Sequence, residues 1–271
     1  MHRTLRDTLA GLGLGAALVA PLAIALPAAP AQAATPEPIV SGHRAATNVS
    51  GVPENSIPAV QYAGRSGASV VEVDARWTSD QYVVVLHDST LDRTTKCTGP
   101  VEALTFAQLR KCADWRTVPA LSNVYRYANM HGMAVNVEVK SVAGRPLTAA
   151  QARQLVARAR TAGASDSTVF SSFSPTILAK IKAQPGANLS RFALITNSSG
   201  RVSSAVARSH GTVYMAQHST LSQVAVDAYH ARGVQVWAWG TKDYARLRGL
   251  GVDVIVADDP AAAKASLRAS R

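Results

Sequence analysis

The sequence predicts an α/β protein built as a TIM barrel, the closed (β/α)8 arrangement. Apolar strand-like runs alternate with helix-like stretches, the pattern typical of a parallel sheet covered by helices. About eight such units fill roughly 230 residues, the usual size of this barrel. Charged residues follow several strand runs, and active sites of such barrels lie at the carboxyl ends of the strands. A doubly wound open sheet is the alternative, but no glycine-rich nucleotide fingerprint follows the first strand.

The predicted elements follow one another along the chain. Strands are expected at 39–42, 69–75, 82–86, 134–139, 168–171, 191–195, 212–215, 234–238 and 252–257. Helices are expected at 55–66, 122–131, 148–162, 175–184, 202–209, 219–232 and 243–249. Gly132, Gly163 and Gly233 follow helix ends, where a left-handed residue suits termination. The repeat breaks at 88–119, which predicts a small inserted loop subdomain beside the barrel mouth.

Residues 1–33 predict a secretory signal peptide, which leaves residues 34–271 as the barrel domain. Arg3 and Arg6 precede an apolar run, and Ala31-Gln32-Ala33 offers small residues for cleavage. An uncleaved anchor is the alternative, since the run approaches the roughly 20 residues that span a bilayer. Prolines in and beside the run disfavour a stable span. We therefore expect a secreted, extracellular protein with no stable membrane insertion after cleavage.

Two cysteines, Cys97 and Cys112, lie in the region that interrupts the repeat. Export permits a disulfide, and an even count leaves no thiol over. A bridge closing a loop of about 15 residues would stabilise the fold by roughly 3 kcal/mol in the chain-entropy model. Two buried free thiols are the alternative.

The chain is basic, with a net charge of +11 and a pI of about 10.1. Lysine and arginine are scattered rather than clustered, and no nucleic-acid recognition motif accompanies them. The charge therefore favours a small phosphate-bearing substrate or a negatively charged cell exterior over a nucleic acid. The sequence carries no signal for an oligomeric state.

Two strand-like segments each direct two charged side chains to one face. Glu72 shares a face with Asp74, and Glu138 shares a face with Lys140, because alternate strand residues point the same way. Buried charges need partners, and three carboxylates are hard oxygen ligands that suit one Ca²⁺ or Mg²⁺. Ordinary ion pairs are the alternative, and a Zn²⁺ site that recruits histidines is less favoured.

Two histidines, His43 and His87, end other apolar runs and are the expected proton carriers. Imidazole changes charge near neutral pH, and cleavage of a phosphodiester needs both a base and an acid. Each is followed by a charged residue, Arg44 or Asp88, which is unusual for a core pair. Arg44 and Lys140 supply positive charge for phosphate oxygens.

Glu54 and the tryptophan pair near a strand end each have a structural and a functional interpretation. Glu54 lies in an expected first helical turn, where the helix dipole alone would favour it. Trp237 and Trp239 share a face near a strand end, so they either pack in the core or contact a glycerol or alcohol moiety. Trp239 is nearer the mouth and is the better candidate for contact.

In order along the chain, these residues resemble the glycerophosphodiester phosphodiesterase family over nearly all of the mature chain. The matching segments are Gly42-His43-Arg44, Pro53-Glu54-Asn55-Ser56, Gly67-Ala68, Glu72-Val73-Asp74, Val85-Leu86-His87-Asp88, Leu91-Asp92-Arg93-Thr94-Thr95, Glu138-Val139-Lys140, Ser172-Phe173, Val236-Trp237-Ala238-Trp239, and Gly251-Val252-Asp253 through Asp259-Pro260. Each segment is a weak signal, but the ordered set is specific.

The resemblance implies a TIM barrel with a small insertion and hydrolysis of glycerophosphodiesters to glycerol 3-phosphate and an alcohol. Glycerophosphocholine and glycerophosphoethanolamine are examples of such substrates. By position, the metal would be bound by Glu72, Asp74 and Glu138, the acid/base pair would be His43 and His87, the phosphate would meet Arg44 and Lys140, and the substrate site would include Glu54, Phe173 and Trp239. The nucleophile would be water or the glycerol hydroxyl of the substrate.

The chain departs from the family pattern beside the first histidine. Ala45 stands where the family usually has glycine, and Ser56 stands where threonine is frequent. The Ala45 methyl is expected to disfavour a left-handed backbone and thereby to shift the loop 44–53. No catalytic position is lost.

Two other functions compete with this one. A phospholipase D-like or sphingomyelinase-like enzyme would use similar carboxylates and histidines on membrane lipids. A secreted, metal-stabilised binding protein without turnover would not need two histidines beside three carboxylates.

Overall fold

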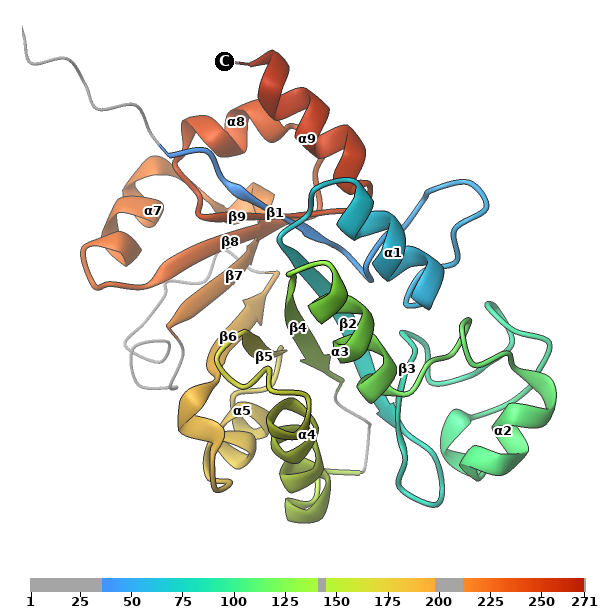
Figure 1. Cartoon of the computed structure of the whole chain (residues 1–271). Coiled ribbons are helices and arrows are strands. Elements are labelled where there is room, and N and C mark those ends of the chain that lie inside the picture. The colour runs from blue at the N-terminus through green and yellow to red at the C-terminus, as the bar shows by residue number, and fades with distance from the viewer. Residues whose placement is uncertain (1–35, 141–144, 198–211, 271) are drawn as a thin grey trace, which may run out of the picture. The chain divides into compact units, whose positions relative to one another are not determined.

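The computed structural model describes residues 36–140, 145–197 and 212–270, and its centre is a closed barrel of parallel strands (Figure 1). The strands are β1 (Ile39–Gly42), β2 (Val70–Trp77), β4 (Ala134–Val139), β5 (Thr168–Ser172), β6 (Arg191–Thr196), β7 (Val213–Gln217), β8 (Gln235–Trp239) and β9 (Val254–Ala257). Because β1 pairs in parallel with both β9 and β2, these eight strands close into a ring. This confirms the predicted TIM barrel, while the signal peptide predicted for residues 1–33 lies outside the described part of the chain.

Helices cover the outside of the barrel (Figure 1). They are α1 (Ile57–Arg65), α3 (Leu121–Met130), α4 (Ala149–Thr161), α5 (Pro175–Lys182), α7 (Gln223–His230), α8 (Tyr244–Gly249) and α9 (Pro260–Ala269), with short 3₁₀ turns η2 (Ala187–Leu189) and η3 (His218–Thr220). Most begin at a side chain that accepts a backbone N–H, as Ser56, Thr148 and Asp259 do. The helix predicted at 202–209 lies outside the described residues. Among the described helices, each falls short of the length and apolarity that a bilayer span requires.

Alternation along β2 decides which side chains face the barrel interior. Val71 and Val73 belong to the large apolar cluster between strands and helices, whereas Val70 packs inside the barrel with residues such as Trp237. Glu72 and Asp74 therefore point into the barrel, above an apolar floor. The strand period thus places two carboxylates at the mouth.

The insertion begins with β3 (Val83–Val85), which pairs antiparallel with β2 and so stays outside the parallel barrel. It continues through η1 (Val101–Ala103) and α2 (Phe106–Cys112), beside β3 and to one side of the barrel (Figure 1). A separate apolar cluster holds it together: Val84, Leu86, Leu91, Cys97, Val101, Leu109, Ala113 and Val118. The predicted disulfide between Cys97 and Cys112 is confirmed, with Cα atoms 5.3 Å apart.

Two helices were not predicted, although the sequence carries their signals. Helix α2 opens with a capping box, because Thr105 and Gln108 each bond the other's backbone N–H. Helix α9 opens with Asp259 as cap and Pro260 in the first turn. The stretch predicted as one helix at 219–232 is η3 followed by α7, since Ser222 caps a new start.

Candidate active site

Three carboxylates meet at the mouth because β2 and β4 are neighbours in register. Asp74 lies opposite Glu138 in the parallel pairing, and Glu72 precedes Asp74 on the same face. One oxygen from each of the three lies within 4.8 Å of the others, and all three residues are buried. Burial and the neighbouring Asp74 raise the pKa of Glu72 to about 8.

The donor chemistry of this cluster fits a divalent cation. Oε1 of Glu72 is buried without a hydrogen-bond partner, while its Oε2 accepts the Arg44 backbone N–H at 2.6 Å. Lys140 Nζ lies 2.9 Å from Asp74 Oδ1 and 2.6 Å from Glu138 Oε1. Although burial opposes it, Lys140 and Asn55 hold the pKa of Asp74 below its ordinary value. An all-oxygen set with an unpartnered buried oxygen suits Ca²⁺ or Mg²⁺.

His43 follows β1 and is oriented by an aspartate that follows β9. Its Nδ1 lies 2.7 Å from Asp258 Oδ1, and its backbone N–H bonds the Ala257 carbonyl at 2.8 Å. Burial lowers the pKa of His43, but the hydrogen bond to Asp258 and the negative charges of Glu72 and Asp258 together outweigh it, so the pKa lies above its ordinary value. The pairing with Asp258 fixes the ring at the cavity.

His87 follows β3 and is oriented by its own neighbour. Its Nδ1 lies 2.8 Å from Asp88 Oδ1, and Arg76 donates from Nε and Nη2 to the His87 carbonyl at 3.0 and 2.7 Å. Burial lowers the pKa of His87 despite the bond to Asp88. Within the described residues, nothing bonds Nε2 of either histidine, so both rings keep that nitrogen for a ligand.

Glu54 joins Arg44 to the insertion. Its Oε1 accepts from Arg44 Nη1 at 3.0 Å and from Arg93 Nη2 at 2.7 Å. Burial works against ionisation, but these two arginines hold the pKa of Glu54 below its ordinary value. The expectation that Glu54 lies in the first helical turn is wrong, because α1 begins after the cap Ser56; Glu54 instead acts on Arg44 and Arg93.

The backbone that follows β1 has a left-handed conformation at two successive residues, with φ of 49° at Arg44 and 63° at Ala45. The expectation that Ala45 avoids this conformation is wrong. Ala45 is fully buried and its N–H bonds the Glu72 carbonyl at 2.7 Å, so its surroundings hold it there. A Cβ on Gly42 would lie 1.8 Å from the Ala45 carbonyl oxygen, which explains a glycine before His43.

These residues surround one cavity of about 230 Å³ with a charged half and an apolar half. Its lining residues are His43, Arg44, Glu72, His87, Glu138, Lys140, Phe173, Ile195, Met215, Trp239 and Val256. The rings of Phe173 and Trp239 meet edge to face at 6.3 Å. Trp237 is instead buried in the barrel core. Eight of the ten residues that the resemblance assigns to the site line this cavity, and the other two, Glu54 and Asp74, pair with Arg44 and Lys140 of its wall.

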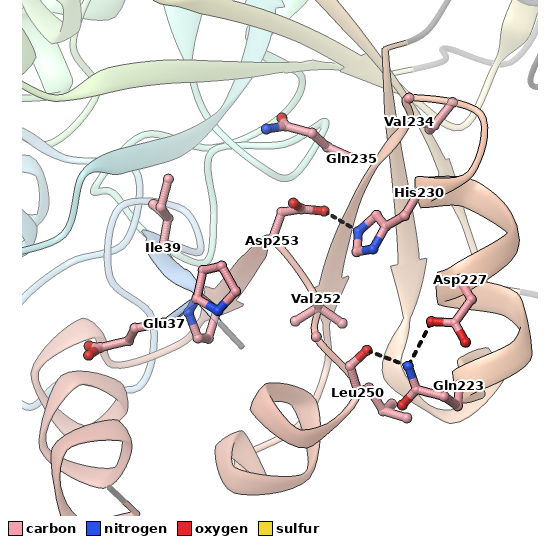
Figure 2. Close-up of a pocket in the computed structure, with 14 residues that line it drawn as sticks. Glu37, Ile39, Gln223, Asp227, His230, Val234, Gln235, Leu250, Val252 and Asp253 are labelled. Carbon is pink, nitrogen blue, oxygen red and sulfur yellow. Dashed lines mark hydrogen bonds and ion pairs between the residues drawn. The ribbon is translucent and has the colours of Figure 1, made fainter. Parts of the chain in front are cut away.

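A larger cavity, of about 620 Å³, lies at the amino ends of β1, β8 and β9 (Figure 2). There His230 Nε2 lies 2.8 Å from Asp253 Oδ2, which also accepts the Val236 N–H at 2.7 Å. This pair ties the end of α7 to the start of β8. In the part of the chain that the structure describes, the side chains that could bind a metal ion, Glu72, Asp74 and Glu138, lie at the smaller cavity.

Three site residues escaped the sequence reasoning. Asp258 orients His43, and Arg93 bonds Asp88 Oδ2 at 2.6 Å as well as Glu54. Asn55, with φ of 56°, donates to Asp74 Oδ2 at 2.7 Å and accepts the Asp74 N–H at 3.1 Å. All three occur in or beside the segments that carry the family resemblance, but each has a partner that is 19 or more residues away in the chain.

Comparison with known proteins agrees with this geometry. The model of the glycerophosphoryl diester phosphodiesterase family matches residues 43–262. The provisionally named glycerophosphodiester phosphodiesterase YhdW of Bacillus subtilis is 25% identical over 240 residues, which cover 82% of this chain and 94% of YhdW. Human glycerophosphodiester phosphodiesterase 1 is 49% identical over 59 residues, but these cover 22% of this chain and 18% of the human protein.

A solved structure also shares the fold. A phosphodiesterase from Oleispira antarctica, in complex with the product sn-glycerol-3-phosphate, superposes with a TM-score of 0.76 at 22% identity, covering 85% of this chain and 97% of that one. The family match spans most of the chain and begins at His43. The chain therefore belongs to the glycerophosphoryl diester phosphodiesterase family.

Proposed function

We propose that the protein hydrolyses glycerophosphodiesters to glycerol 3-phosphate and a free alcohol, with the aid of one divalent cation. The observation that carries this proposal is the convergence of two aspartate-held imidazoles, three carboxylates and two cationic side chains on one small cavity. The product bound to the Oleispira antarctica relative is consistent with it.

The cation would be held by Glu72, Asp74 and Glu138, and it would supply positive charge against the phosphate. Lys140 now lies between two of these carboxylates, so it is the side chain placed to share phosphate oxygens with the cation. Arg44 offers a planar guanidinium at the same cavity, held by Glu54. The charged half of the cavity is therefore the phosphate side.

The two histidines divide the proton transfers. One Nε2 takes the proton of the nucleophile as its oxygen bonds to phosphorus, and the other Nε2 protonates the alcohol oxygen as its bond to phosphorus breaks. The nucleophile is water, or the glycerol hydroxyl of the substrate by way of a cyclic phosphate that water then opens. Asp258 and Asp88 keep Nδ1 engaged, so each ring presents Nε2.

The substrate is a small phosphodiester rather than an intact lipid. The cavity volume of about 230 Å³ suits a glycerol phosphate group, and the apolar half formed by Phe173, Met215 and Trp239 suits the carbon face of glycerol. We also propose that the mature protein works outside the cell, as the amino-terminal signal pattern and the disulfide would allow.

The deciding experiment uses metal-depleted protein and glycerophosphocholine. Adding back Ca²⁺, Mg²⁺ or Zn²⁺ separately, with release of choline and glycerol 3-phosphate measured, should restore activity with Ca²⁺ or Mg²⁺. His43→Ala and His87→Ala should each lower turnover by about 10²- to 10⁴-fold. Vesicles of intact phosphatidylcholine and sphingomyelin form the comparison arm. Faster release from vesicles, or full activity in both alanine variants, would overturn the proposal.

A further inference from the structure

We propose that Arg93 of the insertion is a positioning residue that holds His87 and Arg44 in one fixed relation; this inference rests on the proposed function. Arg93 is not among the residues that line the cavity, and in the sequence it lies between His87 and the disulfide-bonded Cys97. It touches neither the three carboxylates nor the Nε2 atoms. Any effect on the reaction must therefore pass through the residues that it binds.

One guanidinium binds two carboxylates that serve different parts of the site. Arg93 Nε donates to Asp88 Oδ2 at 2.6 Å, and Arg93 Nη2 donates to Glu54 Oε1 at 2.7 Å. Asp88 uses its other oxygen for His87, and Glu54 shares Oε1 with Arg44. The result is a continuous chain of hydrogen bonds from the imidazole, through the insertion, to the phosphate-side arginine.

The chain of bonds joins segments that the barrel alone does not join. Arg44 lies in the loop after β1, His87 lies after β3, and Arg93 comes from the insertion. The insertion supports Arg93 locally, because Leu91 N–H bonds the Gly99 carbonyl at 3.0 Å and Gly99 N–H bonds Asp92 Oδ2 at 3.0 Å. The insertion thus contributes order to the site without lining it.

The Arg93 side chain is itself half exposed, but the burial of Glu54 and the donor geometry distinguish this contact from an ordinary surface ion pair. The Glu54 side chain is 10% exposed, so loss of Arg93 would leave a largely buried carboxylate with Arg44 as its remaining described partner. Lysine offers one nitrogen, whereas two nitrogens of the Arg93 plane reach two carboxylates. A lysine substitution should therefore fail to restore the geometry.

The test compares Arg93→Gln, Arg93→Lys and the control Arg145→Gln in the full metal-loaded enzyme. Arg145 also pairs with a carboxylate of the insertion, Glu102 at 2.9 Å, but that pair is away from the cavity. Arg93→Gln should lower kcat/KM on glycerophosphocholine by about 10- to 100-fold through both kcat and KM. Arg93→Lys should stay closer to Arg93→Gln than to wild type, and Arg145→Gln should stay within about twofold of wild type.

A second readout does not require turnover. NMR titration of the histidine ring protons should show that the titration midpoint of His87 differs between Arg93→Gln and wild type, whereas the midpoint of His43 stays the same. His87 faces Asp74, Lys140 and Arg44 besides Asp88, and these groups are common to all variants. A wild type without activity would defeat the proposed function but leave this readout valid. Unchanged His87 titration, or wild-type kcat/KM in a folded Arg93→Gln, would overturn the positioning role.

Discussion

The two histidines of the cavity are held in the same way by aspartates at very different distances in the sequence. Asp88 is the next residue after His87, whereas Asp258 lies 215 residues from His43. Sequence could suggest the first pair from adjacency. The second depends on β1 and β9 becoming neighbours in the closed sheet, which is why Asp258 was missed although His43 was found.

Asp258→Asn should shift the pH profile of activity. The hydrogen bond from His43 to Asp258 is the main cause that raises the pKa of His43, so its loss lowers that pKa. The limb of the profile that reports His43 should therefore move to lower pH, whether the ring acts as acid or base. Asp253→Asn is the control, since it breaks the Asp253–His230 pair, which lies away from the active-site cavity. An unmoved limb in Asp258→Asn would contradict the assignment.

Gly42→Ala should unfold the loop that carries His43 and Arg44. The new Cβ would meet the Ala45 carbonyl oxygen at 1.8 Å, and a backbone atom cannot yield as a flexible side chain can. We expect a loss of about 1–3 kcal/mol in the free energy of unfolding, together with loss of activity. Gly249→Ala is the matched control, because its Cβ would meet nothing within 4 Å. Equal stability of the two variants by chemical denaturation would disprove the clash.

At the scale of elements, hydrophobic periodicity predicted which strands exist better than it predicted the residues at which they begin and end. The strands β1 and β4 have the predicted bounds, and most others differ by one or two residues. The predicted strand at 82–86 exists as β3, but it pairs antiparallel with β2. Its apolar run resembles a barrel strand because both of its faces are covered, one by the insertion's own cluster. Direction of pairing is a tertiary property that a short apolar run does not encode.

The disulfide should matter more to the insertion than to the barrel. Cys97 and Cys112 are 15 residues apart, so replacing both with serine should lower stability by roughly 3 kcal/mol in the chain-entropy model. The barrel has its own core, whereas the insertion relies on a small cluster that includes Cys97. Hydrogen exchange should therefore increase in 88–119 before it increases in the strands. Reductant should reproduce the effect in wild type and have none in the double variant.

At the scale of the whole molecule, cation binding should be linked to pH. In the metal-free protein the pKa of Glu72 is about 8, against 4.5 as the ordinary value. Between these values the folded state keeps a proton that the unfolded state releases, so metal-free stability falls as pH rises through that window. A cation that replaces this proton should raise the melting temperature more at pH 8 than at pH 5.

Thermal unfolding with and without Ca²⁺ or Mg²⁺ at both pH values measures this linkage. Glu72→Gln is the control, since its amide does not titrate in this pH range. The substitution also removes the negative charge of one metal ligand. The variant should lose both the fall in metal-free stability and the stabilisation by cation. A cation effect that is equal at the two pH values in wild type would contradict the assignment of Glu72 as a ligand.

The barrel itself was predictable because eight repeats of strand and helix leave few topologies, and the family segments added the ordered site residues. Closure was the part that periodicity could not supply, since it depends on β1 accepting β9 on one side and β2 on the other. The left-handed Ala45 was mispredicted for a similar reason. Contacts with Glu72, distant in sequence, outweigh the local preference of alanine.

The pairing of β1 with β9 has a consequence for synthesis. A growing polypeptide that has delivered β1 through β8 carries both imidazoles and all three acids, yet it lacks the residue that holds His43. The His43 ring can be held by Asp258 only after the final strand has been synthesised. Completion of the His43–Asp258 pair therefore waits for the carboxyl-terminal part of the chain.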